Sequence, residues 1–456
     1  MDGGVLIDGL AFIVRELALF AAVGFLVLGA SDLLVDLIWI GLRLKRFILR
    51  VRPARLDDLA GPAQPGCLAV FVPAWHEQDV VGRMLANALG AWRGADFRIF
   101  VGCYPNDPAT IAAVRMVSGE RIRLVIGDRP GPTTKADNLN TLWAALLEAE
   151  ANGERYKAVV LHDAEDVVHS AELALFDRMV ERFDLVQLPV LPLIPKRKRG
   201  VSAHYVDEFC ESHGKELVVR EALGAGLPSA GVGCAISRDA MTLLAGPDNA
   251  PFDAASLTED YEIGLKLHAL GRRGAFVRLP ANGSGVVSTR EHFPADFRGA
   301  IAQKSRWIAG IALSGWDRLG WRGGIAERWM RLRDRQAPLA ALLLVVAYFT
   351  FLAMPLLGFA AALAGQPVVL ITPLLGTLMT VAAGLLAWRL IMRFAFVARS
   401  YGVVEGLRAV PRVIVSNAIA ILAAREALSR YARARHTGAP EWGKTTHVFP
   451  DQVPAE

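Results

Sequence analysis

Three long apolar stretches constrain the fold of this chain more than any other feature. They run roughly over residues 17–44, 338–363 and 368–396, and a helix needs about 20 apolar residues to cross a bilayer. Hydrophobic residues make up 53% of the 456 residues, too many for an ordinary soluble enzyme, yet 21% are charged. A soluble domain is therefore expected beside membrane helices.

The first apolar stretch does not read as a cleaved signal peptide, because no small-residue cleavage site follows it and Asp32 and Asp36 interrupt it. These two aspartates lie one helical turn apart on one face. Either the helix leaves the lipid or lies at its surface there, or the pair forms a polar seam inside a helix bundle. We favour the first interpretation.

Basic residues flank the apolar stretches and predict their orientation. The brief link Gly365-Gln366-Pro367 joins the second and third stretches into a hairpin and carries no basic residue. The ends distant from the link do: Arg43, Lys45, Arg46, Arg50, Arg52, Arg331, Arg333, Arg335, Arg389 and Arg393. By the positive-inside rule, the hairpin tip lies outside and the large domain is cytoplasmic. The net charge of +5 is thus local in origin, and no nucleic-acid partner is expected.

The predicted domains are an N-terminal membrane helix (1–50), a large α/β domain (60–330), a membrane hairpin (337–398) and a C-terminal part (399–456). In the last part, residues 413–423 are apolar but short for a span. An interfacial or re-entrant helix followed by a cytoplasmic tail is expected. The four cysteines are scattered without metal-ligand spacing, which indicates a reduced compartment and no structural zinc.

The large domain alternates strand and helix patterns, which predicts a mostly parallel sheet covered by helices on both faces. Ligands of such sheets bind at the carboxyl ends of the strands. Strands are expected at 68–72, 98–102, 121–126, 158–162 and 184–188, and helices at 80–91, 110–116, 135–151, 172–182 and 202–223.

Polar motifs follow the first four strands. They are Pro73-Ala74-Trp75-His76-Glu77, Tyr104-Pro105-Asn106-Asp107-Pro108, the Lys135 to Asn140 segment, and His162-Asp163-Ala164-Glu165-Asp166. Lys135 opens a helix, where an ammonium and backbone N–H groups together favour an anion such as a diphosphate. The acids after the fourth strand suit Mg²⁺ or Mn²⁺, which prefer carboxylate oxygens. Asp107 could equally be a turn residue, and Asp166 could replace Glu165 as ligand.

Two further motifs lie downstream. Asp260 closes Thr258-Glu259-Asp260 at a helix start, which favours its ionised form and readiness to accept a proton. About forty residues later, Gln303, Arg306 and Trp307 lie at i, i+3 and i+4, so a helix brings an amide, a cation and an aromatic ring onto one face.

Together these motifs resemble those of family 2 glycosyltransferases over about residues 68–310. The match includes the TED and QxxRW motifs, Gly231-Val232-Gly233, the K-A-x-N-x-N segment and a DxD motif with Glu165 in second place; His76 stands where the family usually has Asn. The resemblance implies a GT-A fold, Rossmann-like, and an inverting reaction. It implies donor binding by Glu77, Asp107, Lys135 and Asn138, a Mg²⁺ or Mn²⁺ ion on Asp163 and Glu165, and catalytic roles for Glu259, Asp260, Gln303, Arg306 and Trp307.

Within the family, the phrases YPNDP, LHDAEDV and QLPVLPL look closest to the phage adsorption protein B type. These are bacterial inner-membrane transferases associated with exopolysaccharide formation and phage adsorption. Longer members carry an additional C-terminal regulatory domain, which this sequence does not contain up to residue 456, so the resemblance leaves control by a cyclic dinucleotide open.

The resulting hypothesis is a multi-pass inner-membrane hexosyltransferase that moves sugar from a nucleotide-sugar, a UDP-sugar by resemblance, to a growing polysaccharide. Three or four membrane segments are few for a secretion channel, so a homo-oligomer or an outer-membrane export partner is expected. One alternative is a single transfer onto polyprenyl phosphate, a lipid-linked acceptor. The other is a non-catalytic membrane scaffold or receptor component.

Overall fold

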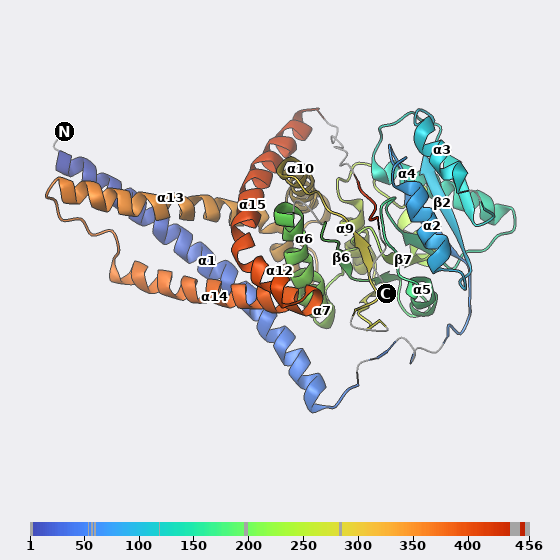
Figure 1. Cartoon of the computed structure of the whole chain (residues 1–456), viewed down its shortest axis with the longest axis horizontal. Coiled ribbons are helices and arrows are strands. Elements are labelled where there is room, and N and C mark those ends of the chain that lie inside the picture. Colours follow the sequence, from blue (N-terminus) through green and yellow to red (C-terminus); the bar gives the residue numbers. More distant parts are fainter. Residues whose placement is uncertain are drawn as a thin grey trace.

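A seven-stranded mixed sheet in the order β3-β2-β1-β4-β7-β5-β8 organises the α/β domain of the computed structural model (Figure 1). The structure describes residues 3–52, 54–55, 58, 61–117, 119–195, 199–281, 285–437 and 447–451. The first four strands pair in parallel, and β7 runs antiparallel between β4 and β5. The strands are β1 (Leu68–Pro73), β2 (Phe97–Cys103), β3 (Ile122–Ile126), β4 (Ala158–Leu161), β5 (Leu185–Gln187), β7 (Cys234–Ser237) and β8 (Gly274–Phe276).

Helices cover both faces of the sheet because successive side chains of each strand point to opposite sides. Leu68, Val70 and Val72 of β1 pack with the helices of one face, while Ala69 and Phe71 pack with those of the other. The first face carries α2 (Val81–Ala91), α3 (Pro108–Met116) and α5 (Glu172–Met179), and the second carries α4 (Lys135–Ala151), α8 (Arg238–Ala245) and α9 (Glu259–Ala269). The mixed α/β prediction is confirmed.

A second, two-stranded sheet and several helices connect the main sheet to the membrane helices. Strands β6 (Val190–Pro192) and β9 (Thr289–Glu291) pair in parallel. The connecting helices are α6 (Arg199–Glu211), a π-helical turn (Ser212–Glu216), α7 (Leu217–Ala222), α10 (Phe297–Ile308), a second π-helical turn (Ala309–Ser314), α11 (Gly315–Leu319) and α12 (Ile325–Arg335).

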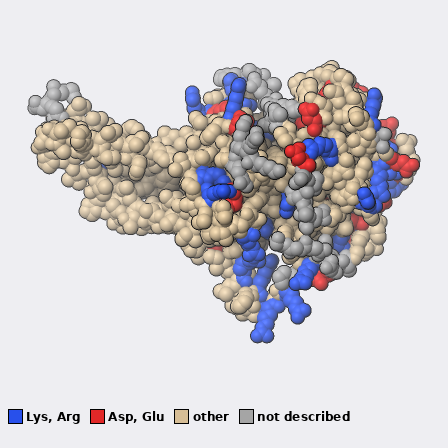
Figure 2. Space-filling model, viewed as in Figure 1, with Lys and Arg blue, Asp and Glu red and all other residues tan. Residues whose placement is uncertain are grey.

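Three long helices project from the domain as an arm (Figure 1). They are α1 (Gly3–Ile48), α13 (Ala337–Leu363) and α14 (Pro373–Tyr401), and each is long and apolar enough to cross a membrane. On the face shown in Figure 2, the outer part of the arm is bare of charged side chains, which gather on and near the α/β domain. The link between α13 and α14 spans 364–372, longer than the expected three-residue turn, because Thr372 caps α14 and Pro373 begins it.

The fourth long helix, α15 (Val403–Thr437), is continuous through Pro411 and also meets the length and hydropathy of a membrane span. In Figure 1 it runs crosswise to α1, α13 and α14, between the arm and the α/β domain, and it contacts α6, α10, α13 and α14. A helix crosswise to a membrane-spanning bundle would lie along the surface, and the interfacial interpretation of this segment stays a prediction.

The two aspartates of α1 form a polar seam, contrary to the interpretation we favoured. Asp36 is 2% exposed, and its Oδ1 lies 2.5 Å from Lys215 Nζ while its Oδ2 accepts from Trp388 Nε1 at 2.9 Å. Asp32 lies 2.9 Å from both Arg333 and Arg389. Because the partners belong to distant helices, the seam joins α1 to α14 and to the α/β domain, which sequence spacing could not reveal.

Candidate active site

A cleft of about 1090 Å³, partly open to solvent, lies at the carboxyl ends of β1 and β4. Ten of the eleven residues expected in the site line it: Glu77, Lys135, Asn138, Asp163, Glu165, Glu259, Asp260, Gln303, Arg306 and Trp307. These residues come from loops after strands and from the first turns of α4 and α9, together with one face of α10. Motifs that are far apart in the sequence therefore meet at the carboxyl edge of the sheet, as expected.

Lys135 and Asp163 form the centre of the cleft. Lys135 Nζ lies 2.5 Å from Asp163 Oδ1, and Lys135 begins α4, which is capped by Thr134 and Asp137 in a capping box. Burial alone would lower the pKa of Lys135, but the carboxylates of Asp163, Glu259 and Asp260 raise it above its usual range. The lysine is thus held as a cation beside a helix N-terminus, an arrangement that attracts anions.

Asp107 is the expected site residue that the structure does not bring to the cleft. It is 1% exposed and caps α3, where its Oδ1 accepts from Thr110 N at 3.3 Å. Its Oδ2 accepts from His76 N at 2.6 Å. One oxygen of Asp107 thus caps α3 and the other holds the loop that carries Glu77, so the structure gives Asp107 a structural role and its direct donor contact stays a prediction.

Asn138 lines the cleft and also fixes α4 on the sheet. Its amide donates to the carbonyl of Gly102 at 3.1 Å, at the end of β2. A Cβ on Gly102 would lie 1.9 Å from Asn138 Oδ1, so glycine is needed at this close approach.

The acids after β4 divide into two roles. Glu165 faces the cleft, and burial raises its pKa to about 8, with Asp163 and Glu77 adding to the shift and His447 opposing it. Asp166 is fully buried and its Oδ2 lies 2.7 Å from His162 Nδ1, while His162 Nε2 lies 2.8 Å from Glu172. Asp166 is engaged in that buried pair, so Glu165 is the second acid presented to a ligand, and His162 is a packed residue.

Asp260 stands opposite Lys135 in the first turn of α9. Burial raises its pKa, Lys135 opposes the shift, and Tyr261 N donates to its Oδ1 at 2.7 Å. Burial and Asp163 therefore act against the preference for the ionised form that the helix start was expected to give Asp260. A raised pKa makes Asp260 a stronger proton acceptor when ionised. Burial likewise raises the pKa of Glu259 to about 7.

Gly231 makes the position of Asp260 sterically accessible. Its φ is +76°, and a Cβ there would lie 2.5 Å from Asp260 Oδ2. Both the backbone conformation and the close approach require glycine.

One face of α10 closes the cleft, as its i, i+3, i+4 spacing predicts. Gln303 is 9% exposed, and its Oε1 has no hydrogen-bond partner among the described residues. Burial lowers the pKa of Arg306, while the carboxylates of Glu259, Asp260 and Asp163 oppose the shift. The guanidinium therefore interacts electrostatically with acids on the other elements of the cleft. Trp307 belongs to an aromatic wall with ring centroids 6.0 to 6.4 Å from its own: Tyr205, Phe209 and Phe293.

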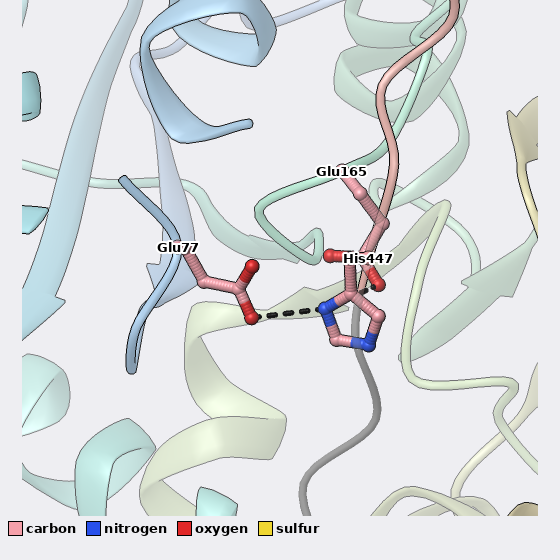
Figure 3. Close-up of side chains that lie close together, drawn as sticks. All are labelled: Glu77, Glu165 and His447. Carbon is pink, nitrogen blue, oxygen red and sulfur yellow. Dashed lines mark hydrogen bonds and ion pairs between the residues drawn. The ribbon is translucent and has the colours of Figure 1, made fainter. Parts of the chain in front are cut away.

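Sequence reasoning missed two titratable residues of the cleft, Glu291 and His447. Glu291 ends β9, and burial raises its pKa well above the usual range. The rule that found the other acids, a polar residue at a strand end, would have found Glu291 had this short strand been predicted. His447 belongs to the C-terminal tail, and its Nδ1 lies 2.9 Å from Glu77 Oε1 and 3.2 Å from Glu165 Oε1 (Figure 3). No sequence signal marked it.

Comparison with known proteins agrees with this arrangement. Residues 65–310 match the family described as "Glycosyltransferase like family 2". The chain is 36% identical, over 96% of its own length, to bacteriophage adsorption protein B of Escherichia coli K12 and to bacteriophage N4 adsorption protein B of E. coli O157:H7. It spans 62% of the length of these relatives.

A solved structure shares the fold of nearly the whole chain. It is a mannosyltransferase of Pyrobaculum calidifontis in complex with GDP-Man and Mn²⁺, with a TM-score of 0.54 and 18% identity. The likeness covers 91% of this chain and 99% of the other. It shows that the α/β domain and the helices around it form a known architecture.

Proposed function

The chain belongs to glycosyltransferase family 2, and we propose that it is a membrane-bound, metal-dependent, inverting hexosyltransferase that elongates a polysaccharide from a nucleotide-sugar. One observation carries the proposal: a single cleft combines positively charged side chains that can bind an anion, a cluster of carboxylates and a buried residue that can act as a base. Lys135, Asp163, Glu165, Asp260 and Arg306 all line it.

The donor half of the cleft suits a nucleoside diphosphate. Lys135 and the start of α4 offer positive charge to the diphosphate. Glu77 also lines the cleft, where its carboxylate can accept a hydrogen bond from a ribose hydroxyl or a base N–H group. By the resemblance of the motifs the donor is a UDP-sugar, whereas the mannosyltransferase of similar fold was solved with GDP-Man.

A divalent cation fits the residues present. Glu165 is buried with a pKa raised to about 8 beside Glu77 and Asp163, so these carboxylates repel one another unless a cation lies among them. Asp163 and Glu165 would hold Mg²⁺ or Mn²⁺, which supplies charge neutralisation of the diphosphate. The other contributions come from the chain itself.

The acceptor half performs the proton transfer. Asp260 accepts the proton of an acceptor hydroxyl as that oxygen attacks the anomeric carbon, and the bond to the diphosphate breaks on the opposite face, which inverts the configuration. Arg306 and Gln303 line the same space, where the guanidinium and the amide N–H groups stabilise the departing charge. Trp307 and its aromatic neighbours offer a stacking surface to an acceptor sugar.

We infer that this cleft lies at the cytoplasmic side of a bacterial inner membrane, and the distribution of basic residues supports the inference. The hairpin tip carries no basic residue, whereas the helix ends near the α/β domain carry many. The acceptor residue Trp307 lies on α10, which packs on the crosswise helix α15. A growing chain or lipid-linked acceptor would therefore leave toward the bilayer, with a second copy or an outer-membrane protein completing export.

The proposal is tested by a donor screen with the purified chain in detergent, including UDP- and GDP-sugars, that reads release of the nucleoside diphosphate. We expect release that requires a divalent cation and stops on chelation. A polymeric product supports a polysaccharide synthase, and one lipid-linked sugar supports the single-transfer alternative. No cation-dependent release from any donor would favour the non-catalytic scaffold and overturn the proposal.

A further inference from the structure

The C-terminal segment 447–451 returns from the membrane helices to the α/β domain and enters the donor half of the cleft. In Figure 1 the short dark-red segment near α9 lies within this domain, far from the outer end of the arm. Figure 3 shows His447 pointing between Glu77 and Glu165, which belong to the loops after β1 and β4. More than 280 residues of chain separate His447 from Glu165, so the contact is a product of the fold.

The segment is anchored as part of the domain. Phe449 is 4% exposed and belongs to the core cluster of the sheet face covered by α2. The guanidinium of Arg83, on α2, lies 5.1 Å from the centre of that ring and donates to the carbonyls of Phe449 and Pro450 at 3.3 and 2.5 Å. Burial of this apolar ring stabilises the segment against the sheet face. His447, two residues away, is therefore positioned by a packed anchor.

We propose that His447 is a ligand of the divalent cation at the donor site, and that the C-terminal segment completes the metal site of the α/β domain. The inference rests on the proposed function. One ligand atom each from Glu77, Glu165 and His447 lie within 4.8 Å of one another, which is close enough for all three to contact a single cation. Asp163, whose Oδ1 lies 2.5 Å from Lys135 Nζ, lines the same cleft.

The ligand set predicts a metal preference. Mg²⁺ prefers oxygen ligands and retains several waters, so an imidazole nitrogen is a poor partner for it. First-row transition metals bind mixed nitrogen and oxygen sites more tightly, in an order that begins with Mn²⁺. A chain that binds its cation through His447 should therefore favour Mn²⁺ over Mg²⁺, and the preference should depend on the imidazole.

The test is pulsed electron paramagnetic resonance of Mn²⁺ bound to the full-length chain in detergent, with and without UDP. We expect a ¹⁴N coupling from a directly bound imidazole in the wild-type chain, which His447→Ala removes together with at least tenfold in Mn²⁺ affinity. His268→Ala is the matched control, because that histidine lies on α9, its side chain is 39% exposed and it does not line the cleft. Phe449→Ala, which loosens the anchor, should weaken Mn²⁺ binding while the coupling persists at saturation.

Two results would overturn the inference. One is Mn²⁺ bound without ¹⁴N coupling in the wild-type chain. The other is a His447→Ala variant with unchanged Mn²⁺ affinity and faster donor turnover, which would make the segment a plug of the donor site. Because the coupling is read without turnover, failure of the proposed function (no diphosphate release from any donor) is distinguishable from failure of this inference.

Discussion

Replacement of Gly231 by alanine should displace the carboxylate of Asp260 and so reduce the rate of transfer, although Asp260 itself is unchanged. The added Cβ would lie 2.5 Å from Asp260 Oδ2, and an ordinary contact begins near 3.4 Å, so the carboxylate must move by about 0.9 Å. A displacement of about 1 Å in a catalytic group costs roughly 100-fold in rate. The φ of +76° adds about 1–2 kcal/mol of backbone strain for alanine.

The matched control is Gly271→Ala, which carries the same strain without the clash. Gly271 has φ of +74° and nothing within 4 Å of an added Cβ. Both variants should lose about 1–2 kcal/mol of stability in chemical unfolding. Only Gly231→Ala should lose about 100-fold in kcat for diphosphate release with acceptor at saturation. Equal kcat values for the two variants would refute the assignment of Asp260 to the reacting centre.

Three further predictions concern the seam, a buried histidine and the aromatic wall. Asp36→Ala leaves the buried Lys215 without its closest carboxylate, which should lower the free energy of unfolding by about 3 kcal/mol. The control Asp8→Ala, on an exposed part of α1, should leave that free energy almost unchanged. Equal losses of stability in the two variants would contradict the structural role of the seam. Burial lowers the pKa of His213 to about 3, so the unfolded state binds the proton first and stability should fall by about 1.4 kcal/mol per pH unit below about pH 6. His213→Asn should remove that slope, and an unchanged pH profile would contradict it. Trp307→Ala should raise the acceptor KM about 10-fold by removing a stacking surface, and an unchanged KM in initial-rate assays would exclude that role.

The sequence predicted the parts of the fold that have strong periodicity. The helix expected at 135–151 has those bounds, and the expected first strand differs from β1 by one residue. Strands β6, β8 and β9 have three residues each and were not predicted, and Glu291 was missed with β9. Strand β5 is equally short, but it was predicted as part of the run 184–188. Short strands of this kind form because their neighbours in the sheet supply the hydrogen bonds.

The candidate site was predictable where a motif followed a strand, and unpredictable where tertiary contact decided the role. Asp107 caps a helix and braces a loop, a role that its position before Pro108 could not distinguish from donor binding. Asp36 pairs with the buried Lys215, and Asp32 pairs with Arg333 and Arg389, all on helices far along the chain. His447 enters the cleft because Phe449 packs into the core, and local sequence carries no record of that packing.

The central claim is that Asp260 removes the proton of the acceptor hydroxyl. Asp260→Asn keeps the shape of the side chain and its contact with Tyr261 N but cannot accept a proton. The decisive measurement compares donor affinity and transfer to acceptor in the folded variant and in the wild-type chain. The account predicts unchanged donor affinity and a loss of about 10³-fold in transfer; transfer at the wild-type rate would contradict it.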